Sequence, residues 1–290
     1  MKKTFLLKRM LLFVGVMLVA AGSQAQSASL LWKVTSQGST KPTYIFGTIH
    51  SIPQSQFFFP EAINEALKSS DKLVLEIDMD STEELATLPS LIVLKGKTMK
   101  DLLTAEEVKK LSRYLSDSAG IPFEQVTAFK PFVFTSLLLP KIVGSSTVSY
   151  EQHLLAAAKQ MGKPVDGIET VAEQVGAFDK LPMEQQAKQL VEMVSDMNKA
   201  REEYQQLLNA YTNQQLNKIA ELTEKSNKDF PQFSQVLITD RNVSWIPRLE
   251  KIIGNGGAFV AVGAAHLPGS NGVVELLKKK GYSVEPVTIK

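Results

Sequence analysis

Two apolar, β-favouring runs near opposite ends of the chain finish in the same tetrapeptide, Gly-x-x-His. The first run covers residues 44–50 (YIFGTIH) and the second covers residues 259–266 (FVAVGAAH). The chain has only three histidines, and two of them occupy this position. In open α/β sheets, residues just beyond the ends of central strands face the crevice that holds ligands. A fold that uses both segments in this way must bring the two ends of the chain together in one sheet.

The remaining patterns predict strands near both ends of the chain and helices between them. Residues 43–46 and 72–78 read as strands on either side of a helix that starts at Pro60, an order that favours a parallel sheet. A long helix is expected over 182–211, where apolar residues keep a four-three step. Packing against helices of the same chain is preferred to a coiled-coil dimer. The expected fold class is α/β, with α+β as the alternative: a central mixed sheet formed by the N- and C-terminal segments, and a large helical insertion over about 100–250.

Residues 1–25 have the pattern of a secretory signal peptide. Four basic residues open the segment, and the apolar run over 11–21 that follows is shorter than the ~20 residues needed to span a bilayer. Ser23 and Ala25 supply the small residues of a cleavage site after Ala25. An uncleaved anchor is the alternative. We expect a single domain over 26–290 that is periplasmic or secreted and has no membrane span in the mature chain.

Charge and composition exclude several classes of function. Loss of the leader reduces the basic residues from 32 to 28 against 30 acidic residues, which changes the net charge from +2 to −2. The mature chain therefore has no electrostatic case for binding nucleic acid. The absence of cysteine excludes thiol catalysis and thiolate metal sites. No Gly-x-Ser-x-Gly elbow and no His-Glu-x-x-His helix is present.

The two repeated histidines, His50 and His266, are the first candidates for chemistry. An imidazole offers a neutral nitrogen to a metal or carries a proton near physiological pH. Glycines at Gly47 and Gly263 let the backbone turn sharply or come close to a ligand. The alternative is that both histidines merely begin loops. The third histidine, His153, lies on an expected helix and is interpreted as structural.

Two glutamates and one Arg-Asn pair complete the candidate set. Glu76 ends an apolar strand, where a carboxylate needs a metal or a cationic partner such as a lysine or arginine. Glu169 follows Gly167 at an expected strand-to-helix junction, and a carboxylate that stabilises the helix start is the alternative. Arg241 and Asn242 could hold a substrate carboxylate or main chain, or pair with an internal acid. Two histidines with one or two carboxylates suit Zn, Mn, Co or Fe(II) in an open catalytic site.

Five segments in this order resemble the TraB/GumN family, which includes bacterial pheromone-shutdown proteins and the animal Tiki proteins. The segments are residues 44–51 (YIFGTIHS), 73–78 (LVLEID), 162–174 (GKPVDGIETVAEQ), 240–242 (DRN) and 262–269 (VGAAHLPG). The resemblance covers about 31–286. It implies a metal-dependent peptidase with a core similar to erythromycin-esterase-like, ChaN-like and Tiki folds. By position, the resemblance places His50, His266, Glu76, Glu169 and Arg241 on motif residues of the family.

The leading hypothesis is an exported metal-dependent hydrolase, a Tiki-like peptidase that acts on peptide or protein substrates. Its divalent ion (Mn, Co or Zn) would be held by His50, His266 and Glu76. Glu169 would be the base or a further ligand, and Glu76 and Arg241 belong with it to the catalytic set. Substrate contacts are assigned to Gly47, Ser51, Asn242 and Gly263. The alternatives are a protein that sequesters a peptide signal without cleaving it, and a haem- or metal-binding protein.

Overall fold

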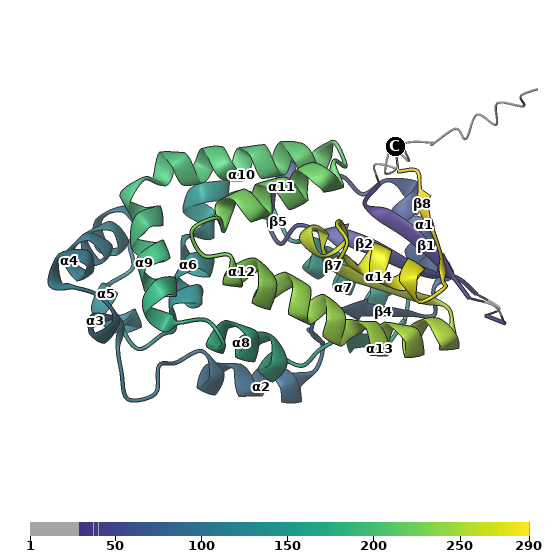
Figure 1. Cartoon of the computed structure of the whole chain (residues 1–290), viewed down its shortest axis with the longest axis horizontal. Coiled ribbons are helices and arrows are strands. Elements are labelled where there is room, and N and C mark those ends of the chain that lie inside the picture. Colours follow the sequence, from purple (N-terminus) through teal and green to yellow (C-terminus); the bar gives the residue numbers. More distant parts are fainter. Residues whose placement is uncertain (1–28, 37, 40, 290) are drawn as a thin grey trace, which may run out of the picture.

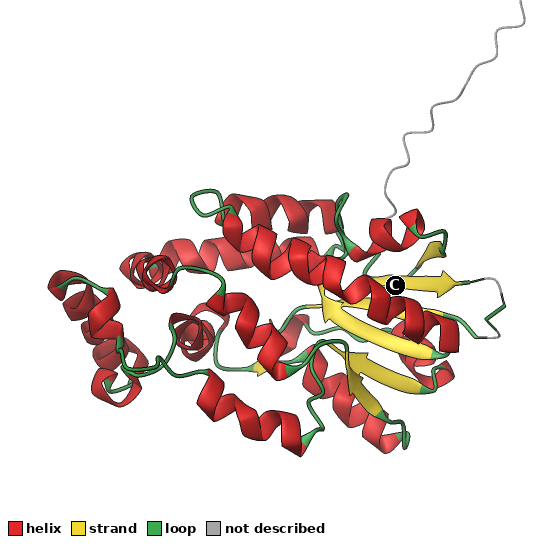
Figure 2. Cartoon of the chain, turned by 60° about the horizontal axis from the view of Figure 1, so that its bottom comes forward, coloured by secondary structure: helices red, strands yellow, loops and turns green. Residues whose placement is uncertain are grey.

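A six-stranded mixed sheet forms one end of the molecule, and helices make up the rest (Figures 1 and 2). The computed structural model describes residues 29–36, 38–39 and 41–289, so the predicted signal peptide lies outside the described residues. The strand order is β6-β4-β7-β2-β1-β8. The strands are β1 (Leu31–Thr35), β2 (Thr43–Thr48), β4 (Lys72–Leu75), β6 (Val165–Gly167), β7 (Ala258–Gly263) and β8 (Ser283–Val287). This architecture confirms the α/β class.

The two Gly-x-x-His segments lie on neighbouring parallel strands. β2 pairs with β7 so that Tyr44 is opposite Phe259 and Thr48 is opposite Gly263. β7 also pairs in parallel with β4, and β4 pairs in parallel with β6. The expected strands at 43–46 and 72–78 are therefore parallel members of one sheet, with β7 between them. β6 lies within the range expected for the helical insertion and pairs with β4, so the insertion also contributes the edge strand that precedes Glu169.

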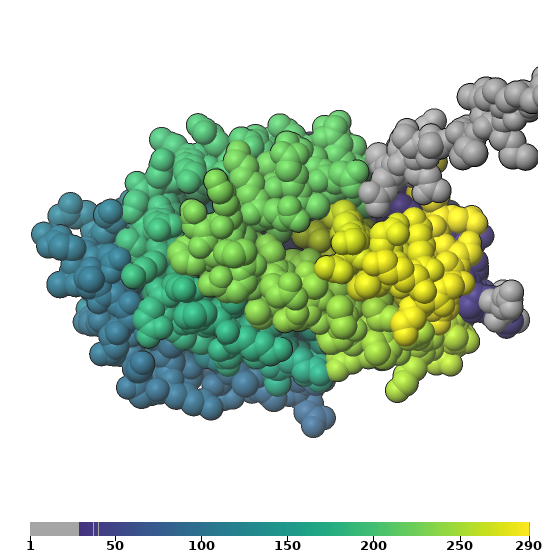
Figure 3. All heavy atoms as spheres, in the orientation of Figure 1, coloured from purple at the N-terminus to yellow at the C-terminus, as the bar shows by residue number. Residues whose placement is uncertain are grey.

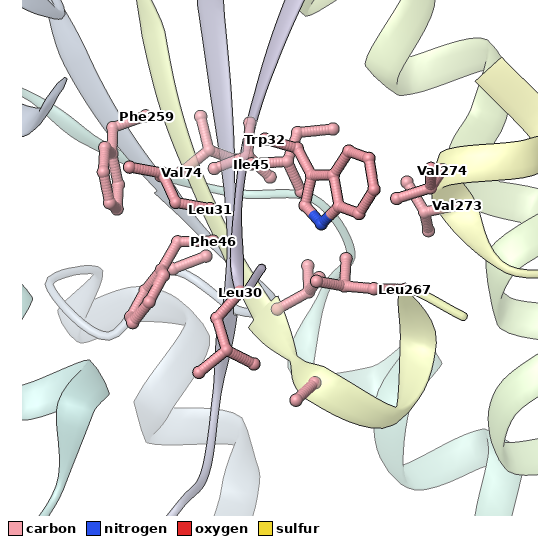
Figure 4. Packing of buried hydrophobic residues seen from close by; sticks show 14 of the residues in the cluster. Leu30, Leu31, Trp32, Ile45, Phe46, Val74, Phe259, Leu267, Val273 and Val274 are labelled. Carbon is pink, nitrogen blue, oxygen red and sulfur yellow. The ribbon is translucent and has the colours of Figure 1, made fainter. Parts of the chain in front are cut away.

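The antiparallel edge strands close the other side of the sheet. β1 pairs with β2 and with β8, both in antiparallel directions. The buried side chain of Trp32 faces Val273 and Val274 of helix α14 (Val273–Lys279), as Figure 4 shows. Burial of a large apolar side chain of this kind stabilises a fold by about 1.5–3 kcal/mol. The central strand β7 is buried along almost its whole length, as expected for a strand covered on both faces.

Two groups of helices accompany the sheet. The helices that contribute buried residues to the core around the sheet are α1 (Glu61–Ser69), α7 (Tyr150–Gln160), α10 (Met197–Thr212), α11 (Leu216–Ser226), α13 (Asp240–Asn255) and α14. The other helices are α2 (Thr82–Leu91), α3 (Met99–Leu102), α4 (Ala105–Arg113), α5 (Phe123–Val126), α6 (Pro131–Val143), α8 (Val171–Asp179), α9 (Met183–Ser195) and α12 (Gln232–Ser234). Figure 3 shows the segment that carries α3 to α5, in blue, at the end opposite the yellow C-terminal segment, whereas α2 lies beside α8 in Figure 1.

The helix expected over 182–211 is two helices, α9 and α10. The break is at Asp196, whose backbone (φ −142°, ψ 74°) is not helical. Its side chain accepts a hydrogen bond from the backbone N–H of Lys199, at 3.0 Å. Aspartate is a preferred N-cap residue because its carboxylate satisfies such free amides. The four-three step of apolar residues continues across the break, which is why the pattern predicted one helix.

The helical part has an apolar core of its own, distinct from the core around the sheet. Its buried members come from several helices and include Leu111, Phe134 and Leu190. A two-stranded sheet of β3 (Ile52–Pro53) and β5 (Thr147–Val148) links the segment after His50 to the start of α7. Within the described part of the chain, no helix combines the length and the apolar character needed to cross a membrane.

Candidate functional site

The candidate site lies where the parallel strands end. Glu76 directly follows β4, Glu169 comes two residues after β6, and His266 comes three residues after β7. Because the carboxyl ends of parallel strands share one edge of the sheet, these side chains meet there although they are up to 190 positions apart in the sequence. Glu76, Glu169 and His266 are all buried.

Arg241 of α13 joins the two carboxylates. Its Nη2 donates to Glu76 Oε2 at 2.5 Å and to Glu169 Oε1 at 2.6 Å, and its Nε donates to Glu169 Oε1 at 3.1 Å. Its Nη1 donates to the Leu237 carbonyl at 3.1 Å and lies 3.2 Å from Nε2 of His266. A guanidinium has five N–H donors, so acceptors of the protein occupy all of them in this structure. Arg241 therefore acts here on the carboxylates and on His266, rather than offering free donors to a substrate.

A widened helical turn supports the position of Arg241. Residues Gln235–Thr239 form a π-helical turn directly before α13, and the Leu237 carbonyl that accepts from Arg241 lies in this turn. Such turns are rare and occur often at functional sites. On the other side, the guanidinium lies over the ring of Trp245, 4.7 Å from the ring centroid. Trp245 comes four residues after Arg241, so both side chains share one face of the helix.

The protein fixes the tautomer of His266 through Asn242. The amide nitrogen of Asn242 donates to the carbonyls of His266 (3.2 Å) and Asn271 (2.9 Å), so its Oδ1 is the acceptor that faces the imidazole. Nδ1 of His266 lies 2.7 Å from that oxygen and therefore carries the proton. The lone pair is left on Nε2, which lies 3.9 Å from Glu76 Oε1. Asn242 is fully buried behind the histidine, which makes it a partner of His266 rather than a substrate contact.

Charge and burial determine the protonation states of Glu76, His266 and Arg241 at neutral pH. Burial alone would raise the pKa of Glu76, but the charges of His266, Arg241 and His50 and the N–H of Gly263 lower it to about 2. Desolvation lowers the pKa of His266 to about 3, against the opposing effect of Glu76. Burial would lower the pKa of Arg241, but the two glutamates raise it. At neutral pH, Glu76 is a carboxylate, His266 is a neutral imidazole and Arg241 is a cation.

Two residues that the sequence analysis did not single out hold Glu169 in place. The indole Nε1 of Trp245 donates to Glu169 Oε2 at 2.8 Å. The amide of Gln174 donates to Glu76 Oε2 at 3.0 Å and to Glu169 Oε1 at 3.2 Å. Gln174 ends the GKPVDGIETVAEQ segment, and Trp245 follows Arg241 at helical spacing. These two positions in the sequence could have identified Gln174 and Trp245 as candidate site residues.

The side chain of His50 is hydrogen-bonded to Glu151 and not to the residues of this buried group. Its side chain is 71% exposed, and its Nδ1 lies 3.1 Å from Glu151 Oε1. Thr48 and Ser149 also donate to the carboxylate of Glu151, at 2.7 and 2.8 Å. The hydrogen bond to Glu151, together with the charges of Glu151 and Glu76, raises the pKa of His50 to about 9, and the charge of Arg241 opposes that shift. Sequence reasoning missed Glu151, whose only signal was its place in the first turn of an expected helix.

The remaining candidate residues, Gly47, Ser51 and Gly263, make contacts within the protein that explain their positions. The Ser51 carbonyl accepts from the hydroxyl of Tyr204 at 2.5 Å, and the Gly47 carbonyl accepts from Tyr211 at 3.0 Å. A Cβ on Gly47 would lie 2.8 Å from Leu267 Cδ1 and 3.1 Å from the backbone of Ala264, so close packing of two segments explains this glycine. The Gly263 N–H donates to Glu76 Oε1 at 2.8 Å. His153 packs against Phe57 and Phe59, in keeping with a structural role.

The predicted metal ligands are only partly brought together among the described residues. Nowhere among residues 29–36, 38–39 and 41–289 do three or more His, Asp or Glu residues form a ready-made metal-binding group. His266 Nε2 and Glu76 Oε1 alone are 3.9 Å apart, which two ligands of one ion with bonds of about 2.1 Å can span. The donor types of His266 and Glu76 fit a divalent ion, but Nε2 of His266 accepts from Nη1 of Arg241 in this structure. The third predicted ligand, His50, is held by Glu151.

The fold and the site together define an α/β protein that assembles a histidine–carboxylate–arginine cluster from both ends of its chain. The sequence profile of the TraB/PrgY/gumN family matches residues 30–286. The chain belongs to this family, which confirms the resemblance drawn from the five motifs.

Curated relatives are distant but extend over most of the chain. Metalloprotease TIKI2 of Danio rerio is 23% identical over 320 residues, which cover 91% of this chain and 62% of the relative. The protein YbaP of Shigella flexneri is 24% identical over 244 residues, which cover 81% of this chain and 88% of YbaP. A Metalloprotease TIKI homolog of Amphimedon queenslandica is 22% identical. The chain thus spans less than two thirds of the length of the Tiki relatives. No solved structure matches it.

Proposed function

We propose that this protein is a metal-dependent hydrolase that cleaves peptides or proteins outside the cytoplasm. The observation that carries the proposal is the unprotonated Nε2 of His266, held 3.9 Å from the ionised carboxylate of Glu76. A neutral imidazole and a carboxylate in this relation are ligands that Zn, Mn and Co accept. The distant similarity to proteins named metalloproteases supports the same function.

The residues that would hold the ion are His266 and Glu76, with His50 as the third ligand once its Nε2 has lost the proton that a pKa of about 9 retains at neutral pH. A bound divalent ion would supply Lewis acidity to polarise a peptide carbonyl or to lower the pKa of a water molecule. Asn242 keeps Nε2 of His266 free of a proton. The N–H of Gly263 fixes Oε1 of Glu76, which is the oxygen nearer to the imidazole.

Glu169 is the carboxylate that remains for proton transfer. It is 4% exposed and is oriented by Trp245, Gln174 and Arg241. In the proposed reaction it accepts a proton from the attacking water or serves as a further ligand. Arg241 links Glu169 to Glu76 and supplies the cation that pairs with both buried side chains.

The test is metal content together with peptide cleavage by the purified mature protein. We expect about one divalent ion per chain after loading with Zn, Mn or Co, and cleavage products in mass spectra of a peptide library. His266→Ala and His50→Ala should lose the ion and the cleavage, whereas His153→Ala should keep both, because His153 packs against Phe57 and Phe59 and is not a member of the proposed ligand set. Wild type without bound metal, or histidine variants with unchanged cleavage, would refute the proposal.

A second candidate function is capture of a peptide without cleavage. The observation that favours it is the complete internal pairing of Arg241 and of both carboxylates, which leaves the cluster stable without a ligand. This function predicts tight peptide binding in calorimetry and the intact peptide in mass spectra after prolonged incubation. Cleavage products that disappear in the His266→Ala variant would exclude it.

A further inference from the structure

Glu151, at the start of α7, is the meeting point of three side chains from the first Gly-x-x-His segment and its surroundings. Its Oε1 accepts from Thr48 Oγ1 at 2.7 Å and lies 3.1 Å from Nδ1 of His50. Its Oε2 accepts from Ser149 Oγ at 2.8 Å. The carboxylate itself is only 15% exposed, whereas the imidazole that it holds is 71% exposed. The exposed imidazole is therefore held by a mostly buried carboxylate, which is itself fixed by two hydroxyl groups.

The backbone around His50 is also held from α10. The hydroxyl of Tyr211 donates to the carbonyl of Gly47, and the hydroxyl of Tyr204 donates to the carbonyl of Ser51. These two carbonyls lie on either side of His50 in the sequence. The helices α7 and α10 thus fix both the main chain and the side chain of this segment. The arrangement leaves one polar atom of the ring, Nε2, without a partner among the hydrogen bonds of the described residues.

We propose that Glu151 is a positioning residue of the site, which orients the ring of His50 and fixes Nδ1 as the hydrogen-bonded nitrogen so that Nε2 is presented to a substrate or metal. Histidines that ligate metals almost always donate their other ring N–H to a carboxylate or a carbonyl. Asn242 does the same for His266 with an amide oxygen. The inference rests on the proposed function insofar as His50 takes part in hydrolysis.

The alternative role for Glu151 is purely structural: an acidic side chain in the first turn can stabilise the start of a helix. The start of α7 already has its cap, because Ser149 accepts from the backbone N–H of Gln152 at 3.3 Å. The three donors to Glu151 are side chains, and none of the hydrogen bonds described for its carboxylate comes from a backbone N–H. The carboxylate is therefore directed at Thr48 and His50 rather than at the helix.

The experiment compares Glu151→Ala and Glu151→Gln with Glu106→Ala, which removes an exposed acid from the first turn of α4. The first readout is the ring ¹⁵N–¹H spectrum of the metal-free protein, in which the three histidines can be assigned by single replacements. The second readout is kcat and KM for a cleaved peptide. Glu151→Gln keeps the size of the side chain and one acceptor oxygen, so it separates loss of the anchor from loss of folding.

We expect the wild type to show a downfield Nδ1–H signal of His50 that Glu151→Ala abolishes. In the same variant kcat should fall about 10-fold or more, with KM changed less than about twofold. Glu151→Gln should restore part of both, and Glu106→Ala should change neither. An unchanged His50 signal in Glu151→Ala, or a lost signal with unchanged kcat, would overturn the inference. If the wild type cleaves no peptide, the proposed function fails, and the spectrum alone decides the role of Glu151.

Discussion

Glu76 and Glu169 bind the same nitrogen of one guanidinium, Nη2 of Arg241, at 2.5 and 2.6 Å. Two buried carboxylates this close to each other would repel, and one of them would take up a proton. The shared arginine places a positive charge beside both carboxylates and helps to hold the pKa of Glu76 well below its ordinary value, against the effect of burial. The close approach of Glu76 and Glu169 therefore depends on Arg241.

Removal of the shared arginine should destabilise the fold strongly. In Arg241→Met two buried carboxylates lose their counter-charge, and breaking a buried pair in this way costs about 3–5 kcal/mol. We expect that loss in urea unfolding at pH 7, and partial recovery in the double variant Arg241→Met, Glu76→Gln.

The matched control is Arg248→Met on the same helix. Arg248 pairs with Glu173, but the two side chains are 41% and 45% exposed. Exposed pairs contribute about 0–1 kcal/mol. Equal losses of stability in the two arginine variants would contradict the central role of Arg241.

The stability of the protein should be greatest near pH 6.5. In the unfolded chain His266 takes up a proton near pH 6.5, whereas the folded protein does not until about pH 3. The unfolded state therefore gains protons as the pH falls, and stability decreases by up to about 1.4 kcal/mol per pH unit. Below pH 4.5 Glu76 steepens the loss, because its folded pKa is about 2.

Above pH 6.5 the stability of the protein depends on His50, because folding raises the pKa of this histidine whereas it lowers the pKa of His266. The folded pKa of His50, about 9, lies above the ordinary 6.5, so its contribution is complete below pH 6.5 and is lost as the pH rises through 9. Urea midpoints between pH 4 and 10 measure both limbs. His266→Gln should flatten the curve between pH 6.5 and 4.5, and His50→Gln should flatten it on the alkaline side. An unchanged acid limb in His266→Gln would show that other groups cause it.

Replacement of Asn242 by aspartate should raise the pKa of His266 above about 3, because a carboxylate beside Nδ1 favours the imidazolium. NMR titration of the ring measures this shift. We also expect 10- to 100-fold lower peptide cleavage at neutral pH, which is typical when such a partner is changed. Asn64→Asp, on the partly exposed face of α1, adds the same charge and should leave His266 unchanged.

Alanine at Gly47 should destabilise the protein by about 1–3 kcal/mol, the range for overpacking a well-packed core. The added Cβ would lie 2.8 Å from Leu267 and 3.1 Å from the backbone of Ala264, which cannot move without shifting the segment that carries His266. Gly176→Ala is the control, because its Cβ would meet nothing within 4 Å and helix propensity favours alanine. Thermal unfolding should show a lower midpoint for the first variant and an equal or higher midpoint for the second.

The sequence contained enough information to predict the sheet and the buried half of the site. Apolar runs that end in polar residues predicted β2, β4 and β7, and the scarcity of histidine directed attention to His50 and His266. Residues that directly follow strands are predictable in this way because parallel strands deliver them to one edge.

The partners of these residues could not be predicted, because they depend on contacts between distant segments. Glu151 meets His50 across 101 positions and Trp245 meets Glu169 across 76, and neither has a local pattern that distinguishes it from an ordinary helical residue. The break at Asp196 was hidden because the apolar step continues through it. The full pairing of Arg241 was equally invisible, since a sequence does not show which donors are already occupied.

The parallel pairing of β2 with β7 also determines when the site can exist during synthesis of the chain. β2 is complete by residue 48, but its neighbour begins only at residue 258, after all of the helices up to α13 have been made. Pairing over so long a separation is slow, because the loop must close before its contacts form. A growing chain therefore has only half of the Gly-x-x-His pair, and the cluster of Glu76, Arg241 and His266 cannot assemble until about the last ninth of the chain is made.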